Sequence, residues 1–312
     1  YIYIQYLFFK QWNSLREYAH GKGIGIIGDM PIYAAHDSAD VWRAREQFLL
    51  DENGQPTVVA GFPPDGLSAD GQLWGNPIYN WERMKKENFS WWIDRIRASF
   101  DLYDILRIDH FIGFENYYAI PWPSKTAHGG TWRKAPGTEL FTEVKKALPD
   151  IKIIAEDLGI VTDEVRKLLA FTGFPGMKML HFAFYEDDSD NLPRRYNSDN
   201  WVVYTSSHDS DCTVSWGRGL NKETLARFRR ECPRKRGQSI TGALIAFAMG
   251  SRANLAMVPM QDYLELDNEK GRMNIPSTSQ GNWSWRLPGD YATPALKRKI
   301  TRVTRENNRF AE

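Results

Sequence analysis

Six short, strongly apolar segments recur along the chain, and an acidic residue follows each of them within a few positions. Segments of this length that are rich in β-branched residues are typical of strands buried on both faces of a parallel sheet. We therefore predict six strands and expect the acids at their carboxyl ends to be functional candidates. The predicted strands are residues 24–28, 102–108, 151–155, 177–184, 201–205 and 255–260, followed by Asp29, Asp109, Glu156, Glu186, Asp209 and Asp262.

Segments with the apolar periodicity of helices separate these strands. They cover residues 4–19, 92–100, 162–169, 221–228, 240–249 and 293–303. Alternating strands and helices indicate the α/β class with a mostly parallel sheet, either an open doubly wound sheet or a closed (β/α)8 TIM barrel. Acids at several strand ends favour the barrel. Six strands do not close a standard barrel, so we expect the first two βα units to precede this sequence and the six C-terminal units to lie within it.

Three long segments between these elements show no regular periodicity. Residues 51–80, 112–137 and 262–286 are predicted to be long inserted loops, and loops of this length usually line or cover a site. Their aromatic residues suit a carbohydrate groove. We predict one catalytic barrel domain over residues 1–312, incomplete at its N-terminus, with residues 46–100 forming an inserted loop and helical subdomain over the active site.

Charge and composition exclude several classes of partner. Forty Lys and Arg residues oppose 39 Asp and Glu residues, which leaves no electrostatic basis for binding nucleic acid or an anionic membrane. The most apolar stretch, residues 1–9, is shorter than the ~20 residues that a bilayer span needs. The two cysteines, Cys212 and Cys232, match no zinc spacing and favour a reducing compartment. We expect a cytoplasmic protein, or a plastid protein in a plant or alga.

Arg107 and Asp109 lie two positions apart on one predicted strand, so their side chains share a face. A guanidinium beside a carboxylate lowers the carboxylate's pKa. An ionised carboxylate is what a nucleophile attacking a sugar's anomeric carbon requires. Taken alone, this pair is more often a structural ion pair at a strand end.

Glu156 follows buried apolar residues, so its carboxyl group is expected to be partly desolvated and to retain a proton, as a general acid requires. Asp157 points to the other face and is expected to orient the backbone. His208 and Asp209 could bind a sugar hydroxyl and stabilise an oxocarbenium-like transition state, or could only shape their loop. Asp29 is similarly ambiguous.

Taken together, three carboxylates at three strand ends match the requirements of retaining glycosidic chemistry. We expect Asp109, Glu156 and Asp209 to surround one pyranose ring, with the first two carboxyl groups ~5–5.5 Å apart. A magnesium site could use the same acids, but no lysine base is apparent at a strand end. A Cys212 nucleophile lacks a convincing activating neighbour, and the motifs of zinc proteases, P-loop proteins and Ser hydrolases are missing from the sequence.

The motifs around these residues resemble one known family. They are GDMPIYAAHDSADVW, PPDGLSADGQLWGNPIYNW, LRIDHFIGFENYYAIP, IIAEDLG, YTSSHDSD and MQDYLELDNEKGRMNIPSTSQGNWSWR. Their combination and order resemble the 4-α-glucanotransferase family, glycoside hydrolase family 77, a relative of the α-amylase clan. The sequence departs from the family's usual pattern at Ile112, Ser207, Ser210 and Cys212, which flank the acids without replacing them.

The resemblance implies a (β/α)8 barrel acting on α-1,4-glucans and maltooligosaccharides, without a metal or organic cofactor. It implies that Asp109 is the nucleophile, Glu156 the general acid/base and Asp209 the transition-state stabiliser. It implies further binding residues: Asp29, Arg107, His110, His208 and Asn274 at the donor sugar, and Asp65, Gln72 and Trp74 on a loop that holds the acceptor. The alternatives are an α-glucan hydrolase of the same clan and an inactive glucan-binding fragment.

Overall fold

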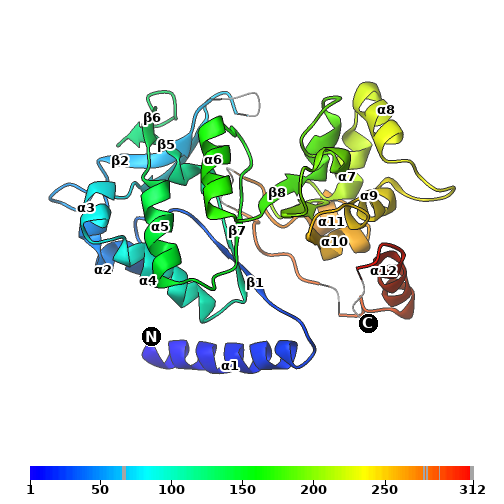
Figure 1. Cartoon of the computed structure of the whole chain (residues 1–312), viewed down its shortest axis with the longest axis horizontal. Coiled ribbons are helices and arrows are strands. Elements are labelled where there is room, and N and C mark those ends of the chain that lie inside the picture. Colours follow the sequence, from blue (N-terminus) through cyan, green and yellow to red (C-terminus); the bar gives the residue numbers. More distant parts are fainter. Residues whose placement is uncertain (65–67, 277, 279, 288, 310–312) are drawn as a thin grey trace. The chain divides into compact units, whose positions relative to one another are not determined.

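The computed structural model describes residues 1–64, 68–276, 278, 280–287 and 289–309. The chain divides into two compact units, Tyr1–Gly176 and Met177–Glu312, each described below by itself (Figure 1). Among the described residues, no helix is both long enough and apolar enough to cross a membrane.

A three-stranded parallel sheet forms the centre of the first unit. Its strands are β1 (Ile27–Met30), β4 (Ile105–Ile108) and β7 (Ile153–Ala155), in the order β1-β4-β7. Three predicted strands are thereby confirmed, although β1 begins and ends later than expected. Asp29 consequently lies within β1, directly opposite Arg107 of β4.

A four-stranded antiparallel sheet accompanies it. It contains β2 (Val58–Phe62), β3 (Gln72–Pro77), β5 (Asn116–Pro121) and β6 (Thr131–Lys134), in the order β3-β2-β5-β6. The prediction that residues 51–80 and 112–137 are structureless loops was therefore wrong for these four stretches. Strand β2 is buried along most of its length, so it lacks the alternating pattern of a half-buried strand. Its pairing with β5 joins segments about 60 residues apart, which no local pattern reveals.

Helices of the first unit occupy the segments that the periodicity indicated, with some additions. They are α1 (Ile2–His20), α2 (Ala39–Arg43), α3 (Trp81–Lys86), α4 (Ser90–Phe100), α5 (Gly137–Ala147) and α6 (Asp163–Thr172), with 3-10 turns at Arg45–Gln47 and Phe111–Phe114. Thr162 caps α6 by accepting a hydrogen bond from the Val165 amide, as expected. Trp92, Phe114 and Phe141 are fully buried and in edge contact, and they pack α4 and α5 into one aromatic core.

The three remaining predicted strands are β8 (Gly176–Met179), which begins at the last residue of the first unit, and β9 (Trp201–Tyr204) and β10 (Leu255–Met257) of the second unit, in the order β10-β9-β8. Strand β8 is shorter than predicted, because residues 180–184 form a 3-10 turn, Leu180–Phe184. The strand predicted over 255–260 also ends early, since Met260 begins a helix. Apolar runs do not distinguish a strand from a buried helical turn.

Six helices surround this second sheet among the described residues. They are α7 (Thr213–Gly219), α8 (Lys222–Glu231), α9 (Ile240–Met249), α10 (Met260–Tyr263), α11 (Asn268–Gly271) and α12 (Pro294–Glu306), with a further 3-10 turn at Pro193–Arg195. Asn221 and Thr293 cap α8 and α12, as expected from the sequence. Helix α11 lies within residues 262–286 and α10 overlaps their start, so the loop predicted there is partly helical.

Candidate active site

Arg107 joins two carboxylates at the end of the first parallel sheet. Its Nη1 atom lies 2.5 Å from Oδ1 of Asp29 and 3.1 Å from Oδ1 of Asp109. The strand register explains this arrangement, because Asp29 of β1 lies opposite Arg107 of β4, and Asp109 directly follows β4, two positions after Arg107. Arg107 is only 8% exposed, and the neighbouring carboxylates outweigh the effect of burial and raise its pKa. The guanidinium therefore stays charged between the two carboxylates.

Glu156 follows β7 and is buried, with 7% of its surface exposed. Its Oε2 atom accepts a 2.7 Å hydrogen bond from the His110 amide, and Oε1 accepts a 3.0 Å bond from the Leu158 amide. Burial, with a further contribution from the Asp109 charge, raises the pKa of Glu156 to about 7. The expected desolvation is confirmed. A carboxyl group with this pKa can both give and take a proton near neutral pH.

His110 directly follows Asp109 and adopts a left-handed backbone conformation, with φ of 53°. Burial lowers the pKa of its imidazole to about 4, so the ring is neutral at physiological pH. The ring makes edge contacts with Trp74, at 4.8 Å between centroids, and with Phe62, at 6.4 Å. A neutral imidazole in this position can hydrogen-bond a hydroxyl group without adding charge.

Gln72 and Trp74 lie on strand β3, which corrects the prediction that they belong to a loop. Both are partly buried, and the indole Nε1 of Trp74 donates a 3.0 Å hydrogen bond to Oε1 of Gln72. Trp74 thus contacts the ring of His110, the residue that follows Asp109 at the end of β4. Asp65, the third residue predicted here, lies outside the described residues.

In the second unit, Asp209 lies five residues beyond the end of β9. Its carboxylate accepts a 2.6 Å hydrogen bond from Nδ2 of Asn274 and lies 3.0 Å from Nε2 of His208. The backbone amide of Asn274 also donates to the carbonyl oxygen of His208, at 3.2 Å. Asn274 is thus brought next to His208 and Asp209, across 65 positions of sequence from Asp209, and about two fifths of the Asp209 side chain remains exposed.

Asp262 is a residue whose function the sequence pattern did not reveal. It is fully buried and accepts hydrogen bonds from the Thr205 hydroxyl at 2.6 Å, the Ser206 hydroxyl at 2.7 Å and the Thr213 amide at 3.1 Å. These three donors lie before and after the segment that carries His208 and Asp209. Asp262 therefore fixes both ends of that segment.

Arg272 is a second residue whose role the sequence pattern did not indicate. Its Nη2 donates a 3.0 Å hydrogen bond to the Asp209 carbonyl oxygen, and its Nη1 lies 2.5 Å from Oδ1 of Asp211. The one available signal was its position in the motif RMN, two residues before Asn274. Arg272 also donates through Nε to the Asn274 carbonyl oxygen, so one guanidinium joins the two segments that hold the Asp209 carboxylate.

The described residues give little support to a cysteine nucleophile or to a metal site. Both cysteines are buried as free thiols, and burial raises the pKa of Cys212 to about 11 and that of Cys232 to about 12. Such thiols carry very little of the nucleophilic thiolate at neutral pH. Within the described part of the chain, no group of three or more His, Cys, Asp or Glu side chains could hold a metal ion.

The predicted residues therefore form two clusters, one in each unit. Asp29, Arg107, Asp109, His110 and Glu156 make up the first, with Gln72 and Trp74 beside it, and His208, Asp209 and Asn274 make up the second. The expectation that Asp109, Glu156 and Asp209 surround a single pyranose ring stays a prediction.

Comparison with known proteins identifies close relatives. A 4-alpha-glucanotransferase from Streptococcus pneumoniae is 48% identical over 99% of this chain, which covers 61% of that relative, and one from Synechocystis is 46% identical over 97% of this chain, which covers 60% of it. The amylomaltase from Streptococcus agalactiae, solved in complex with acarbose, superimposes on 98% of the chain with a TM-score of 0.95 and 43% identity; the chain covers 62% of that structure.

This structural match confirms the predicted α/β fold class of the (β/α)8 barrel type. The chain spans about 60% of the length of the curated relatives named above. The family model described as 4-alpha-glucanotransferase matches residues 1–292. The chain belongs to this family, glycoside hydrolase family 77.

Proposed function

We propose that this protein is a 4-α-glucanotransferase, which transfers a segment of an α-1,4-glucan to the 4-hydroxyl of another glucan or of glucose. The family membership supports the substrate class. The observation that carries the reaction type is the pairing of Asp109, whose carboxylate contacts the Arg107 guanidinium, with the buried Glu156, whose pKa is raised to about 7. One ionised and one protonated carboxyl group are what a retaining displacement requires.

In the first step, Asp109 attacks the anomeric carbon of the donor glucan. As the new bond between carbon and carboxylate oxygen forms, the glycosidic bond breaks and its electron pair goes to the departing oxygen. Glu156 gives its proton to that oxygen, so the leaving glucan departs neutral. The product is a covalent glycosyl-enzyme, and this route requires the two carboxyl groups to be ~5–5.5 Å apart.

In the second step, the ionised Glu156 takes the proton of the acceptor's 4-hydroxyl. The oxygen of that hydroxyl attacks the anomeric carbon and displaces Asp109, which returns as a carboxylate. The raised pKa of Glu156 suits this return of the proton, because a carboxyl group with pKa near 7 is an effective base as well as an acid. Net retention at the anomeric carbon follows from two inversions.

The remaining predicted residues have binding roles in this proposal. Asp209 stabilises the positive charge that develops on the sugar ring, and its hydrogen bonds with His208 and Asn274 hold the carboxylate in a fixed orientation. Asp29, Arg107, His110, His208 and Asn274 contact the donor sugar, while Gln72, Trp74 and Asp65 contact the acceptor. The proposed steps use no metal or organic cofactor.

We also propose a domain organisation and a cellular location for the protein. Residues 1–312 act as one catalytic barrel domain in which residues 46–100 form an inserted loop and helical subdomain over the active site. The protein works in a reducing compartment, the cytoplasm or a plastid, which the two buried free cysteines support.

Incubation with maltotriose tests the proposed activity. A transferase produces a ladder of longer maltooligosaccharides together with glucose, whereas a hydrolase of the same clan produces glucose and maltose without elongation. Asp109→Asn should abolish both products and leave maltooligosaccharide binding largely intact. Binding without any turnover by the unmodified protein would contradict the proposal and favour a non-catalytic glucan-binding protein.

A further inference from the structure

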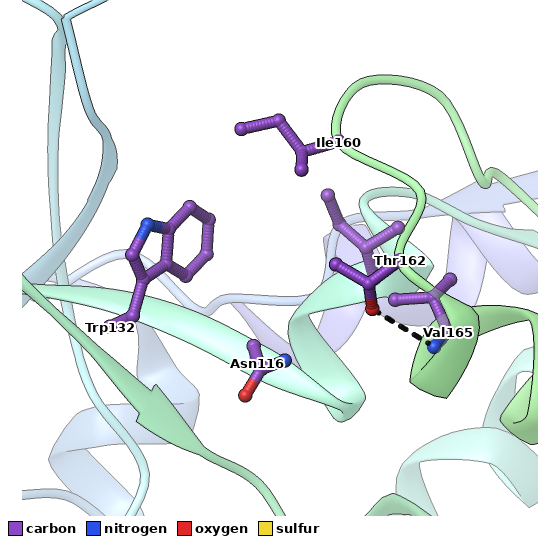
Figure 2. A pocket seen from close by; sticks show the side chains of 6 residues that line it. Asn116, Trp132, Ile160, Thr162 and Val165 are labelled. Carbon is purple, nitrogen blue, oxygen red and sulfur yellow. Dashed lines mark hydrogen bonds between the residues drawn. The ribbon is translucent and has the colours of Figure 1, made fainter.

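A pocket of about 220 Å³ lies in the first unit, outside the residues assigned above. Its lining comes from β5, β6, the 3-10 turn after β4, and the start of α6 with the segment before it: Ile112, Asn116, Trp132, Ile160, Thr162 and Val165. Figure 2 shows Trp132 on one side, Ile160, Thr162 and Val165 on the other, and the Asn116 side chain between them.

The pocket adjoins the cluster of carboxylates. The ring of Phe62 contacts both the Trp132 ring, at 6.0 Å between centroids, and the His110 ring, at 6.4 Å. On the opposite wall, Ile160 lies two residues beyond Leu158, whose amide binds Glu156. The segment after Glu156 therefore supplies both the Leu158 amide that binds Glu156 and the Ile160 side chain that lines the pocket.

The lining indicates a neutral ligand with one apolar face. None of the six side chains is charged, and two large apolar groups are accessible, since Trp132 is 43% exposed and Ile160 is 51% exposed. The Asn116 amide can both donate and accept hydrogen bonds. The Thr162 hydroxyl is already engaged, because its oxygen accepts from the Val165 amide and it is hydrogen-bonded to the Glu164 carboxylate. A pyranose ring combines an apolar face of C–H groups with a rim of hydroxyls, which matches this set.

We propose that this pocket is an additional subsite that binds one glucosyl unit of the α-glucan on the leaving and acceptor side of the reaction, with the sugar stacked on Trp132. This assignment rests on the proposed function, because a general acid contacts the leaving oxygen and the segment after Glu156 forms one wall. An apolar contact here adds affinity for long chains and favours a glucan over water as acceptor.

Binding of maltoheptaose, measured by isothermal titration calorimetry, tests the subsite. Trp132→Ala should weaken binding about five- to tenfold, the loss expected for one aromatic stacking contact. Trp42→Ala is the matched control, because Trp42 is an exposed tryptophan of α2 outside the pocket and should leave the affinity unchanged. Equal affinities of the wild type and Trp132→Ala would overturn the subsite, as would an equal loss in both variants.

A second pair of variants guards against a general effect of losing tryptophan. Ile160→Ala should weaken maltoheptaose binding, and Ile24→Ala, at an exposed isoleucine before β1, should not. An outlying subsite is reached only by a longer chain, so the Trp132→Ala variant should bind maltose as the wild type does. An equal loss for maltose and maltoheptaose would contradict an outlying subsite.

Failure of the subsite is distinguishable from failure of the proposed function. Binding is measured without turnover, so dependence of maltoheptaose affinity on Trp132 supports the subsite even if maltotriose is not elongated. If the protein elongates maltotriose but Trp132→Ala leaves the maltoheptaose affinity unchanged, the transferase is supported and the subsite is overturned.

Discussion

The backbone amide of His110 donates a 2.7 Å hydrogen bond to Oε2 of Glu156. Strand β4 ends just before Asp109, and β7 ends just before Glu156, so this bond joins the ends of two neighbouring parallel strands. The residue next to the proposed nucleophile thereby orients the proposed acid. Because the donor belongs to the backbone, this orientation does not depend on the identity of a side chain.

The titration of Glu156 should make the free energy of unfolding depend on pH. Its folded pKa of about 7 lies above the ordinary value of 4.5, so the folded protein holds a proton that the unfolded chain releases between these values. The associated stability is present below pH 4.5 and is lost as the pH rises through 7, a change of about 3 kcal/mol. Urea unfolding at pH 4.5, 6 and 8 should show this loss in the wild type and not in Glu156→Gln. Glu82→Gln, at an exposed position of α3, is the control, and parallel pH profiles for all three proteins would refute the prediction.

The rate of glucan transfer should fall above neutral pH, because the proposed acid must be protonated in the first step. With a pKa of about 7 for Glu156, kcat/KM should decrease about tenfold per pH unit at higher pH. Replacing Glu156 by Gln should lower the rate by about 10²- to 10⁴-fold and remove this limb of the profile. An unchanged limb in the variant would assign the titration to another group.

Arg107 should control where that limb lies. Its positive charge lowers the pKa of Glu156, opposing burial and the Asp109 charge. Arg107→Met should therefore raise the pKa of Glu156 further and shift the alkaline limb to higher pH, along with a lower maximal rate. Arg107→Lys retains the charge and should shift the limb less. A shift to lower pH in the Met variant, measured from kcat/KM profiles, would contradict this electrostatic account.

Asn274 should contribute to catalysis through Asp209. Its Nδ2 donates a 2.6 Å hydrogen bond to the Asp209 carboxylate, and a bond to a charged group is worth about 1.5–3 kcal/mol. Asn274→Ala should therefore reduce kcat by about 10- to 100-fold with the folded structure retained. Asn53→Ala, at an exposed turn, should match the wild type. If the Asn274 variant keeps the wild-type kcat, the orientation of Asp209 by Asn274 does not contribute to catalysis.

Asp262 should stabilise the second unit. Its replacement by Ala leaves the Thr205 and Ser206 hydroxyls and the Thr213 amide without their acceptor in a buried site, at a cost of about 3 kcal/mol. Asp262→Asn keeps the volume and one acceptor oxygen and should cost less. Chemical unfolding measures both, with the exposed Asp290→Asn as the reference. Equal stability of Asp262→Ala and the reference would show that the segment around Asp209 does not depend on this carboxylate.

The elements that sequence periodicity predicted well are those stabilised by local interactions. Helix α9 occupies the predicted residues 240–249, and the caps at Thr162, Asn221 and Thr293 are in place, because a cap and an apolar helical face both lie within one continuous segment. The six predicted strands were found because each is a continuous apolar run, although the three residues of β10 are only partly buried. Their ends were less certain, and the apolar run at 177–184 continues as a 3-10 turn after Met179.

By itself, the sequence indicated the candidate residues for the proposed chemistry: the acids at strand ends, the arginine two positions before Asp109 and the histidine before Asp209. Only the tertiary structure decided how those residues interact, because β1 aligns Asp29 with Arg107 across 78 residues and Asn274 reaches Asp209 across 65. It also decided that Gln72 and Trp74 lie on a strand, since the sheet that contains them pairs segments far apart in the chain. The pKa of Glu156 depends on burial and on its neighbours' charges, which exist only once these strands have come together.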